Sequence, residues 1–247
     1  MVRIEGRNPV LAALKGKRSV VKIYLQHGAK GSRIEEIKSR AKEDNIVLQF
    51  TEKRHMGKMA DSYSHQGVIA EAEDLELYTP LDMIKKARAG EEVPFLILLD
   101  QIQDPHNFGA IIRTAQVAGA HGVIYPRHRS ADITPAVMKA AAGAVEHIML
   151  SRVTNINYTI RDLKEEGLWI AGADVKGEKE HFDFDLTGPL ALVIGNEGAG
   201  LRRLVKENCD FLVRIPMYGK PSSLNASVAA GIIIYEIVRQ RNLTKPS

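Results

Sequence analysis

The sequence predicts an α/β protein with a mostly parallel β-sheet that helices cover on both faces. From Phe95 onward, apolar runs of four to six residues alternate with segments of helical periodicity. These runs are apolar throughout, which is typical of parallel strands buried on both faces. The preceding residues also alternate helix and strand, so we expect a small α/β module before the sheet.

The first module is expected to span residues 1–75. Asn8 and Pro9 are placed to cap and begin a short helix, which Gly16 should end. A strand, a helix and two further strands should follow, at residues 20–25, 33–44, 46–50 and 67–71. Residues 76–94 combine charged residues with a short helical segment, and we interpret them as a linker.

The second module is expected to span residues 95–247. Strands are predicted at residues 95–99, 122–125, 147–151, 168–173, 190–194 and 211–215, and helices at 108–118, 134–142, 156–166, 201–207 and 224–241. Ligands of open α/β sheets bind beyond the carboxyl ends of the strands. Motifs rich in glycine and polar residues follow three of these strands, so we expect the site there.

The composition excludes several classes of protein. No apolar run is long enough to cross a bilayer, and the first residues lack the apolar region of a secretory signal. Cys209 is the single cysteine, and the eight histidines form no metal-binding pattern. We therefore expect a cytoplasmic protein with no disulfide, no metal and no membrane partner.

Charge is unevenly distributed along the chain. Residues 1–70 carry 14 Lys and Arg against 7 Asp and Glu, whereas residues 71–247 carry 20 against 23. A basic first module favours contact with a polyanion, although an ordinary solvated surface explains the lysines equally well. The candidate contacts are basic side chains early in the chain: Arg3, Arg7, Lys15, Lys17 and Arg18.

The motif N-F-G-A-I-I-R-T-A follows the first strand of the second module. Its Asn107 is placed to cap a helix or to bond a ligand, and could do both. Arg113 lies about two turns inside the same apolar helix, where an arginine either reaches the surface or clamps an anion.

Two further motifs lie later in the chain. L-V-I-G-N-E-G-A-G-L has the glycine order G-x-x-G-x-G, which matches neither a dinucleotide fingerprint nor a P-loop. I-P-M-Y-G-K-P-S-S-L-N-A-S enters a long apolar helix at Ser223 or Leu224. The free N–H groups of a helix N-terminus suit an anionic ligand, and a simple serine cap is the alternative.

In this order and spacing, the three motifs resemble the SpoU (TrmH-like) RNA 2′-O-methyltransferases of the SPOUT superfamily, over roughly residues 95–241. The early segments R-I-E-G-R-N-P-V-L-A-A-L and H-Q-G-V-I-A resemble the substrate-binding domain that many members carry. The pairing is most similar to the RlmB-like subgroup, which methylates a guanosine of 23S rRNA. The resemblance implies a SPOUT-type sheet with a deep C-terminal trefoil knot, which periodicity alone cannot reveal.

The resemblance also implies a cofactor, S-adenosylmethionine, which donates its methyl group to a ribose 2′-hydroxyl without a metal. The family's cofactor-contacting positions match Gly195, Ile215 and Leu224, and Asn196 and Met217 are their neighbours. Turn formation or core packing is the alternative role for each of these residues.

Family precedent assigns activation of the hydroxyl to Arg113, helped by Ser223 and Asn225. A guanidinium stays protonated near neutral pH, so a clamp for phosphate and developing alkoxide is the alternative to a base. Glu197 is placed to orient Arg113 or the substrate, or it is an exposed turn residue. Asn107 completes the set of candidate catalytic residues.

Three functions remain open from the sequence. In the first, the chain methylates a guanosine of 23S rRNA. In the second, it methylates tRNA or another rRNA nucleotide. In the third, it binds RNA through a methyltransferase fold that has lost its activity. The first module disfavours tRNA enzymes with short terminal extensions. The intact candidate residues disfavour the inactive protein. The resemblance also implies a homodimer joined through residues 95–247, and small residues on the last helix permit close packing there: Ala226, Ala229, Ala230 and Gly231.

Overall fold

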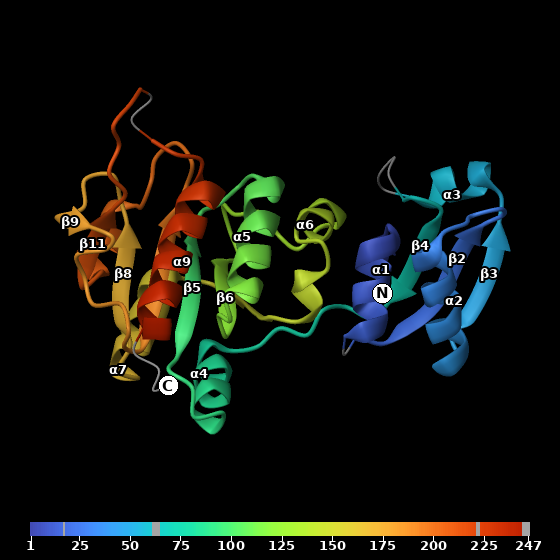
Figure 1. Ribbon diagram of the computed structural model, residues 1–247, viewed down its shortest axis with the longest axis horizontal. Helices are drawn as coiled ribbons and strands as arrows, with labels where there is room; N and C mark the ends of the chain where they lie inside the picture. The colour runs from blue at the N-terminus through green and yellow to red at the C-terminus, as the bar shows by residue number, and fades with distance from the viewer. Residues whose placement is uncertain (17, 61–64, 221–222, 244–247) are drawn as a thin grey trace. The chain divides into compact units, whose positions relative to one another are not determined.

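The chain folds into two compact units in the computed structural model (Figure 1). One unit comprises Met1–Glu76 and Ile133–His147, and the other comprises Leu77–Asp132 and Ile148–Ser247. No described helix is long and apolar enough to cross a membrane. The structure describes residues 1–16, 18–60, 65–220 and 223–243, so Lys17 and two residues of the third motif lie outside it.

The first unit contains a four-stranded mixed sheet in the order β1-β4-β2-β3. β4 pairs antiparallel with β1 and β2, and β2 pairs parallel with β3. The strands are β1 (Val2–Glu5), β2 (Val20–Gln26), β3 (Val47–Thr51) and β4 (Val68–Ala72), and the helices are α1 (Arg7–Lys15), α2 (Ser32–Glu43) and α3 (Lys53–Met59). The short β1 and α3 were not predicted, because neither gives a clear periodic pattern.

Helix α1 begins earlier than the sequence predicted. Gly6 is its N-cap residue, with a φ of 96°, and Asn8 lies inside the first turn. A glycine adopts this positive φ without the strain that a side chain would cause, so the chain turns before it reaches Asn8. Gly16 ends the helix as predicted.

The segment Ile133–His147 packs in the first unit, although the sequence suggested that it continues the parallel-sheet module. It contains α6 (Pro135–Ala140) and a 3₁₀ helix at Ala144–Glu146. Gly143 lies so close to α1 that an added Cβ would be 2.4 Å from the Cβ of Ala12. Periodicity identified the apolar face of this segment but not its partner.

The second unit contains a seven-stranded sheet in the order β7-β6-β5-β10-β8-β11-β9. Every adjacent pair is parallel, which confirms the predicted parallel sheet. The strands are β5 (Phe95–Asp100), β6 (Gly122–Pro126), β7 (Met149–Val153), β8 (Trp169–Ala173), β9 (Lys179–Glu180), β10 (Leu190–Gly195) and β11 (Phe211–Arg214). Only the two-residue β9 was not predicted.

Helices cover both faces of this sheet. On one face, α4 (Pro80–Ala89), α7 (Ile156–Glu165) and α8 (Arg203–Asn208) enclose a continuous apolar core. On the other face, α5 (Pro105–Val117) lies beside α9 (Ala226–Leu243), as Figure 1 shows. The trefoil knot stays a prediction.

Helix α4 is part of the second unit, although its residues were interpreted as a linker. Its Met83 and Ile84 are fully buried in the core beneath the sheet. An added Cβ on Gly122 of β6 would lie 2.2 Å from the sulfur of Met83, so strand and helix fit closely. A chain that began near Glu91 would therefore lose part of its core.

The charge contrast between the units is smaller than the sequence suggested. With residues 71–76 and 133–147 included, the first unit carries 15 Lys and Arg against 12 Asp and Glu, a net charge of +3. The remaining residues carry 19 against 18. The positions of basic side chains, rather than net charge, must therefore support any RNA-binding surface.

A buried ion pair joins the two parts of the first unit. Nε of Arg18 lies 3.2 Å from Oε2 of Glu146, and both side chains are at most 3% exposed. Burial lowers the pKa of Arg18 and raises that of Glu146, in each case against the attraction of the opposite charge. The desolvation of these two groups therefore outweighs their mutual attraction.

We predict that Arg18→Met destabilises the protein by about 3–5 kcal/mol, because it leaves the Glu146 carboxylate buried without a counter-charge. The double variant Arg18→Met/Glu146→Leu should unfold close to the wild type, because neither charge then remains. Urea unfolding of the wild type, both single variants and the double variant checks this. Additive losses in the double variant would contradict it.

Candidate active site

The three motifs meet at the carboxyl edge of the second sheet. Gly195, the last residue of β10, lies in register with Asp100, the last residue of β5. The chain leaves β5 toward β6 on one side, and later strands occupy the other side of β5. Ligands of open α/β sheets bind where the strand order diverges in this way.

A pocket of about 310 Å³ lies at this edge, between the loops after β8, β10 and β11 and the first turns of α9. A volume of this size suits a small organic ligand. Its apolar lining comes mainly from strand ends and α9: Ala173, Ile194, Val213, Ile215, Met217, Leu224, Ala226, Ala229 and Ile233. Its polar lining includes Asp174, Lys176, Asn196, Glu197, Lys206 and Ser223.

The structure places seven of the ten predicted site residues in the wall of this pocket. They are Gly195, Asn196, Glu197, Ile215, Met217, Ser223 and Leu224. Of the other three, Asn107 bonds to one of these residues, Asn225 lies between two lining residues, and Arg113 does not contribute to the wall.

The glycine-rich loop after β10 is closed on itself by Asn196. The main-chain groups of Asn196 and Gly200 exchange two hydrogen bonds, of 3.1 and 2.9 Å. The side-chain Oδ1 of Asn196 also accepts hydrogen bonds from the N–H groups of Gly198 and Ala199. An added Cβ on Gly195 would lie 2.3 Å from the carbonyl carbon of Gly200, so this glycine is required by the loop's own backbone.

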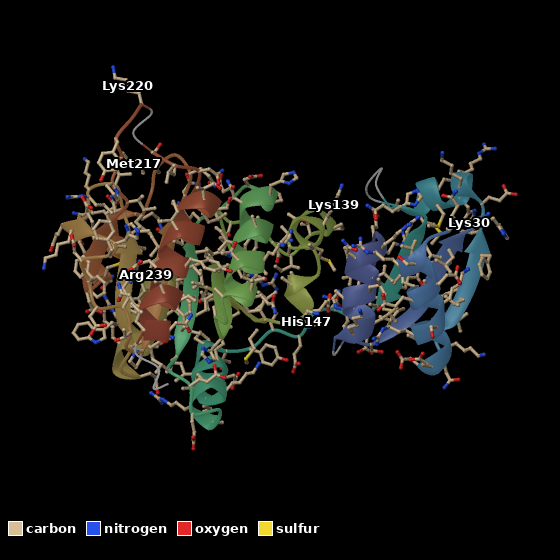
Figure 2. All side chains as sticks on the ribbon, in the orientation of Figure 1. Lys30, Lys139, His147, Met217, Lys220 and Arg239 are labelled. Atoms are coloured by element: carbon tan, nitrogen blue, oxygen red, sulfur yellow. The ribbon has the colours of Figure 1, made fainter. Side chains whose placement is uncertain are left out.

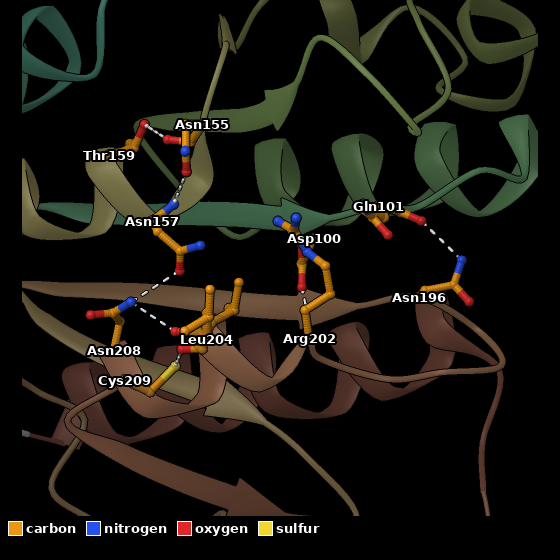
Figure 3. A network of polar contacts seen from close by, with 11 residues as sticks. Asp100, Gln101, Asn155, Asn157, Thr159, Asn196, Arg202, Leu204, Asn208 and Cys209 are labelled. Carbon is orange, nitrogen blue, oxygen red and sulfur yellow. Dashed lines mark hydrogen bonds and ion pairs between the residues drawn. The ribbon is translucent and has the colours of Figure 1, made fainter.

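Two contacts fix this loop against the end of β5 (Figure 3). Nδ2 of Asn196 donates to the main-chain oxygen of Gln101 at 2.9 Å. The fully buried carboxylate of Asp100 accepts hydrogen bonds from Nε and from the main-chain N–H of Arg202 at 2.7 and 3.0 Å. The second motif is thereby held, across 95 residues of sequence, to the end of the strand that leads into the first motif.

Asn107 is a partner of Glu197 and not the cap of α5. The cap is Asp104, whose carboxylate accepts from the N–H groups of His106 and Asn107, with Pro105 as the first helical residue. Asp followed by Pro is a strong signal for a helix start, which the sequence interpretation missed. The nearly buried Asn107 side chain is thus left to donate from Nδ2 to Oε1 of Glu197 at 2.9 Å.

Helix α9 begins later than predicted because Asn225 caps it. Its Oδ1 accepts hydrogen bonds from the N–H and the hydroxyl of Ser227, at 2.9 and 2.6 Å, and from the N–H of Val228. The helix therefore starts at Ala226, and the exposed Ser223 and Leu224 belong to the preceding loop. This capping leaves only the amide NH₂ of Asn225 to bind a substrate.

Arg113 is exposed on α5 and makes no hydrogen bond or ion pair with any described residue. Glu197, which the sequence suggested as its orienting partner, bonds to Asn107 instead. The loop after β11 extends away from the sheet, and Figure 2 shows Met217 and Lys220 along it. Tyr218, also in this loop, is 94% exposed.

The sequence interpretation missed the charged residues after β8. The almost completely buried carboxylate of Asp174 lies 2.5 Å from Nζ of Lys206, and it also accepts from the N–H of Lys176. An aspartate that follows an apolar strand was an available signal, because this position lies at the carboxyl edge. Among the described residues, no group of three or more His, Cys, Asp or Glu could hold a metal ion.

Comparison with known proteins identifies this arrangement. Residues 94–235 match the SpoU rRNA Methylase family, and residues 3–78 match the RNA 2′-O ribose methyltransferase substrate-binding domain. The chain belongs to the SpoU rRNA methylase family. The predicted resemblance is confirmed, and membership makes the chain an RNA methyltransferase that uses S-adenosylmethionine.

Relatives and solved structures of this family cover almost the whole chain. A putative TrmH family tRNA/rRNA methyltransferase, YacO of Bacillus subtilis, is 42% identical over 96% of this chain and 95% of its own. The 23S rRNA (guanosine-2′-O-)-methyltransferase RlmB of Pseudomonas putida is 41% identical over 98% of both. The SpoU methyltransferase AviRb of Streptomyces viridochromogenes, in complex with its cofactor AdoMet, superposes with a TM-score of 0.82, at 27% identity, over 98% of this chain and 90% of its own.

We predict that Gly195→Ala destabilises the protein by about 1–3 kcal/mol and weakens binding of S-adenosylmethionine, because the new methyl group displaces the loop backbone. Gly198→Ala is the matched control, since its Cβ would meet only Oδ1 of Asn196 at 3.7 Å. Thermal unfolding and calorimetric titration with the cofactor measure both effects. Wild-type cofactor affinity in Gly195→Ala would show that this loop does not shape the site.

Proposed function

We propose that this enzyme methylates the ribose 2′-hydroxyl of a guanosine in 23S rRNA and that it works in the cytoplasm. The observation that carries the reaction is the pocket at the divergence of the strands, which gathers seven predicted site residues. The choice of 23S rRNA is supported by the full-length similarity to a 23S rRNA (guanosine-2′-O-)-methyltransferase. YacO, a putative tRNA/rRNA methyltransferase, is similar over almost the same share of the chain, so tRNA is the second candidate substrate.

The pocket has the chemistry that the cofactor requires. Ile215, Leu224 and Ile233 provide an apolar surface for a flat adenine ring, and the loop at 195–200 forms an adjoining wall of the pocket. When bound, S-adenosylmethionine supplies the methyl group that the ribose oxygen receives. We assign Gly195, Ile215 and Leu224 to direct contact with it, and Asn196 and Met217 to the shape of the surrounding loops.

We assign Arg113 to the RNA and not to the cofactor. It is exposed, it has no partner among the described residues, and it lies on the helix whose Asn107 bonds to the pocket residue Glu197. A charged guanidinium in this position suits a clamp for phosphate and for negative charge that develops on the ribose oxygen. Ser223 and the amide of Asn225 are placed to orient the ribose from the other side of the pocket.

The first unit is proposed to select the RNA, but two of the side chains that the sequence suggested are engaged within the fold. Lys15 pairs with Glu36 at 2.6 Å, and Arg18 is buried. A separate cleft in this unit is lined by one basic residue from each of three helices: Arg7 of α1, which the sequence suggested, Arg33 of α2 and Lys53 of α3. We propose that this cleft, and not the whole unit's charge, receives the polyanion.

We predict that the enzyme transfers labelled methyl groups from S-adenosylmethionine to 23S rRNA and not to a tRNA pool. Nuclease digestion and mass spectrometry should locate the methyl group on the ribose of one guanosine.

Arg113→Ala should abolish turnover with cofactor affinity nearly unchanged, because the pocket wall does not include Arg113. Arg113→Lys should also be poor, because a point charge does not reproduce a forked clamp.

The outcomes separate the candidates. Labelled tRNA together with unlabelled rRNA would contradict the proposed 23S rRNA substrate and favour tRNA. A methyl group on a base would contradict ribose methylation. A large loss of cofactor affinity in Arg113→Ala, measured by calorimetry, would contradict the assignment of this arginine to RNA.

We further propose that the enzyme is a homodimer joined through α9. Ala226 and Ala230, small residues first suggested for the contact, are buried within the chain. The outer side of α9 instead exposes a stripe of larger apolar residues at helical spacing: Val228, Ile232 and Tyr235. An exposed apolar stripe beside a cofactor pocket is typical of a surface covered by another chain.

We predict that light scattering at micromolar concentration gives Ile232→Asp the molar mass of one chain and the wild type the molar mass of two. The charge would lie in the centre of the apolar stripe, which two copies bury together. Tyr158→Asp is the matched control, because Tyr158 is 63% exposed on α7, on the opposite face of the sheet. A monomeric wild type would contradict the homodimer.

A further inference from the structure

The loop that follows β6 presents the sequence R-H-R at the same sheet edge as the pocket. We define the basic loop as residues 127–131. Because β6 is parallel to β5 and adjacent to it, their following loops lie side by side at the carboxyl edge. The pocket occupies the loops on the other side of β5. The basic loop therefore flanks the α5 segment opposite the cofactor pocket.

Three hydrogen bonds hold the basic loop in place. The N–H of Arg127 donates to the main-chain oxygen of Val153 at 2.8 Å. At the other end, the N–H of Ala131 and the hydroxyl of Ser130 both donate to the main-chain oxygen of Ile102, at 2.8 and 3.0 Å. The loop is thus attached both to the end of β7 and to the segment between β5 and α5.

The same segment carries the cofactor loop. The main-chain oxygen of Gln101 accepts from Asn196, and that of the next residue, Ile102, accepts from the basic loop. Gln101 has a positive φ of 64°, which turns these neighbouring carbonyl groups to different partners. One short connection therefore joins the pocket wall on one side to the basic loop on the other.

The nearby acidic residue does not neutralise the loop. Asp132 accepts a hydrogen bond from the buried Tyr125 hydroxyl at 3.3 Å and pairs with Nη1 of Arg152 at 2.8 Å. These two contacts engage the carboxylate at the base of the loop, and neither of them involves Arg127 or Arg129.

The two arginines of the loop are available to a ligand. The side chains of Arg127 and Arg129 are exposed, and neither makes a hydrogen bond or an ion pair with a described residue. Arg129 has a φ of 59°, a left-handed conformation that costs a non-glycine residue free energy. Strained backbone held by surrounding contacts is commonly found at functional sites.

We propose that Arg127 and Arg129 bind phosphate groups of the RNA strand beside the target nucleotide and position its ribose against Arg113 and the cofactor pocket. This inference rests on the proposed function. Two forked guanidinium groups separated by one residue suit the phosphate groups of an extended strand. They bind the backbone and read no base, so they orient the RNA while sequence is selected elsewhere.

The test compares Arg127→Gln and Arg129→Asn with the matched control Arg161→Gln. Asparagine tolerates the left-handed backbone at position 129. Arg161 is an exposed arginine on α7 with no carboxylate partner among the described residues. Binding of protein-free 23S rRNA is measured over a range of salt concentrations, together with methyl-transfer kinetics and cofactor titration. Arg127→Lys and Arg129→Lys test rescue by charge.

Each neutral loop variant should weaken RNA binding about tenfold at fixed salt, since each loses a hydrogen bond to a charged group. The slope of log affinity against log salt should fall by about 1 for each arginine removed. The KM for RNA should rise while cofactor affinity stays unchanged, and the lysine variants should recover the slope. The Arg161 control should match the wild type in every measurement.

Wild-type RNA affinity and salt slope in both neutral loop variants would overturn the inference, as would an equal loss in the Arg161 control. Failure of the proposed function is recognised separately, because it appears as wild-type enzyme that leaves rRNA unlabelled. Loss of cofactor binding in the loop variants would mean that the basic loop supports the fold, which also overturns the inference.

Discussion

The site depends on the parallel pairing of β10 with β5. This pairing brings the end of the first strand of the sheet beside a strand that follows it by almost a hundred residues, with Gly195 opposite Asp100. A shift of one residue would turn the buried side chains of β10 to the wrong face. It would also separate Asn196 from Gln101, and Asp100 from Arg202. Packing of the core and construction of the site are therefore parts of the same constraint.

The contacts at this edge follow a consistent division between buried and exposed groups. Buried polar side chains bond to one another or to the backbone: Asp100 to Arg202, Asn107 to Glu197, and Asp174 to Lys206. Such fully paired groups hold loops in one arrangement, whereas a half-satisfied group would cost stability. The exposed Arg113, Arg127 and Arg129 at this edge have no hydrogen-bond or ion-pair partner among the described residues, so they can bind an anion without breaking such a contact.

The sequence predicted the second unit well because its strands and helices have strong, regular patterns. It also predicted seven of the residues that line the pocket, since glycine-rich and polar motifs follow apolar strands. It could not predict pairings such as Asn107 with Glu197, which depend on strand order and not on local pattern. The roles of Asp104, which precedes a proline at a helix start, and Asp174, which directly follows a strand, were predictable from the sequence and were missed. The placement of residues 133–147 was not readable, because an apolar helix face does not identify its partner.

The insertion of residues 133–147 into the first unit has a consequence for synthesis of the chain. The ribosome releases Met1–Glu76 first, but Glu146, the counter-charge of buried Arg18, emerges only after 70 further residues. At about 5–20 residues per second, this interval lasts several seconds. During this interval, the surface of α1 that Gly143 later covers stays exposed, and Arg18 remains hydrated. The first unit therefore cannot finish folding before the second begins to be synthesised, because its last segment lies between the two parts of the second unit in the sequence.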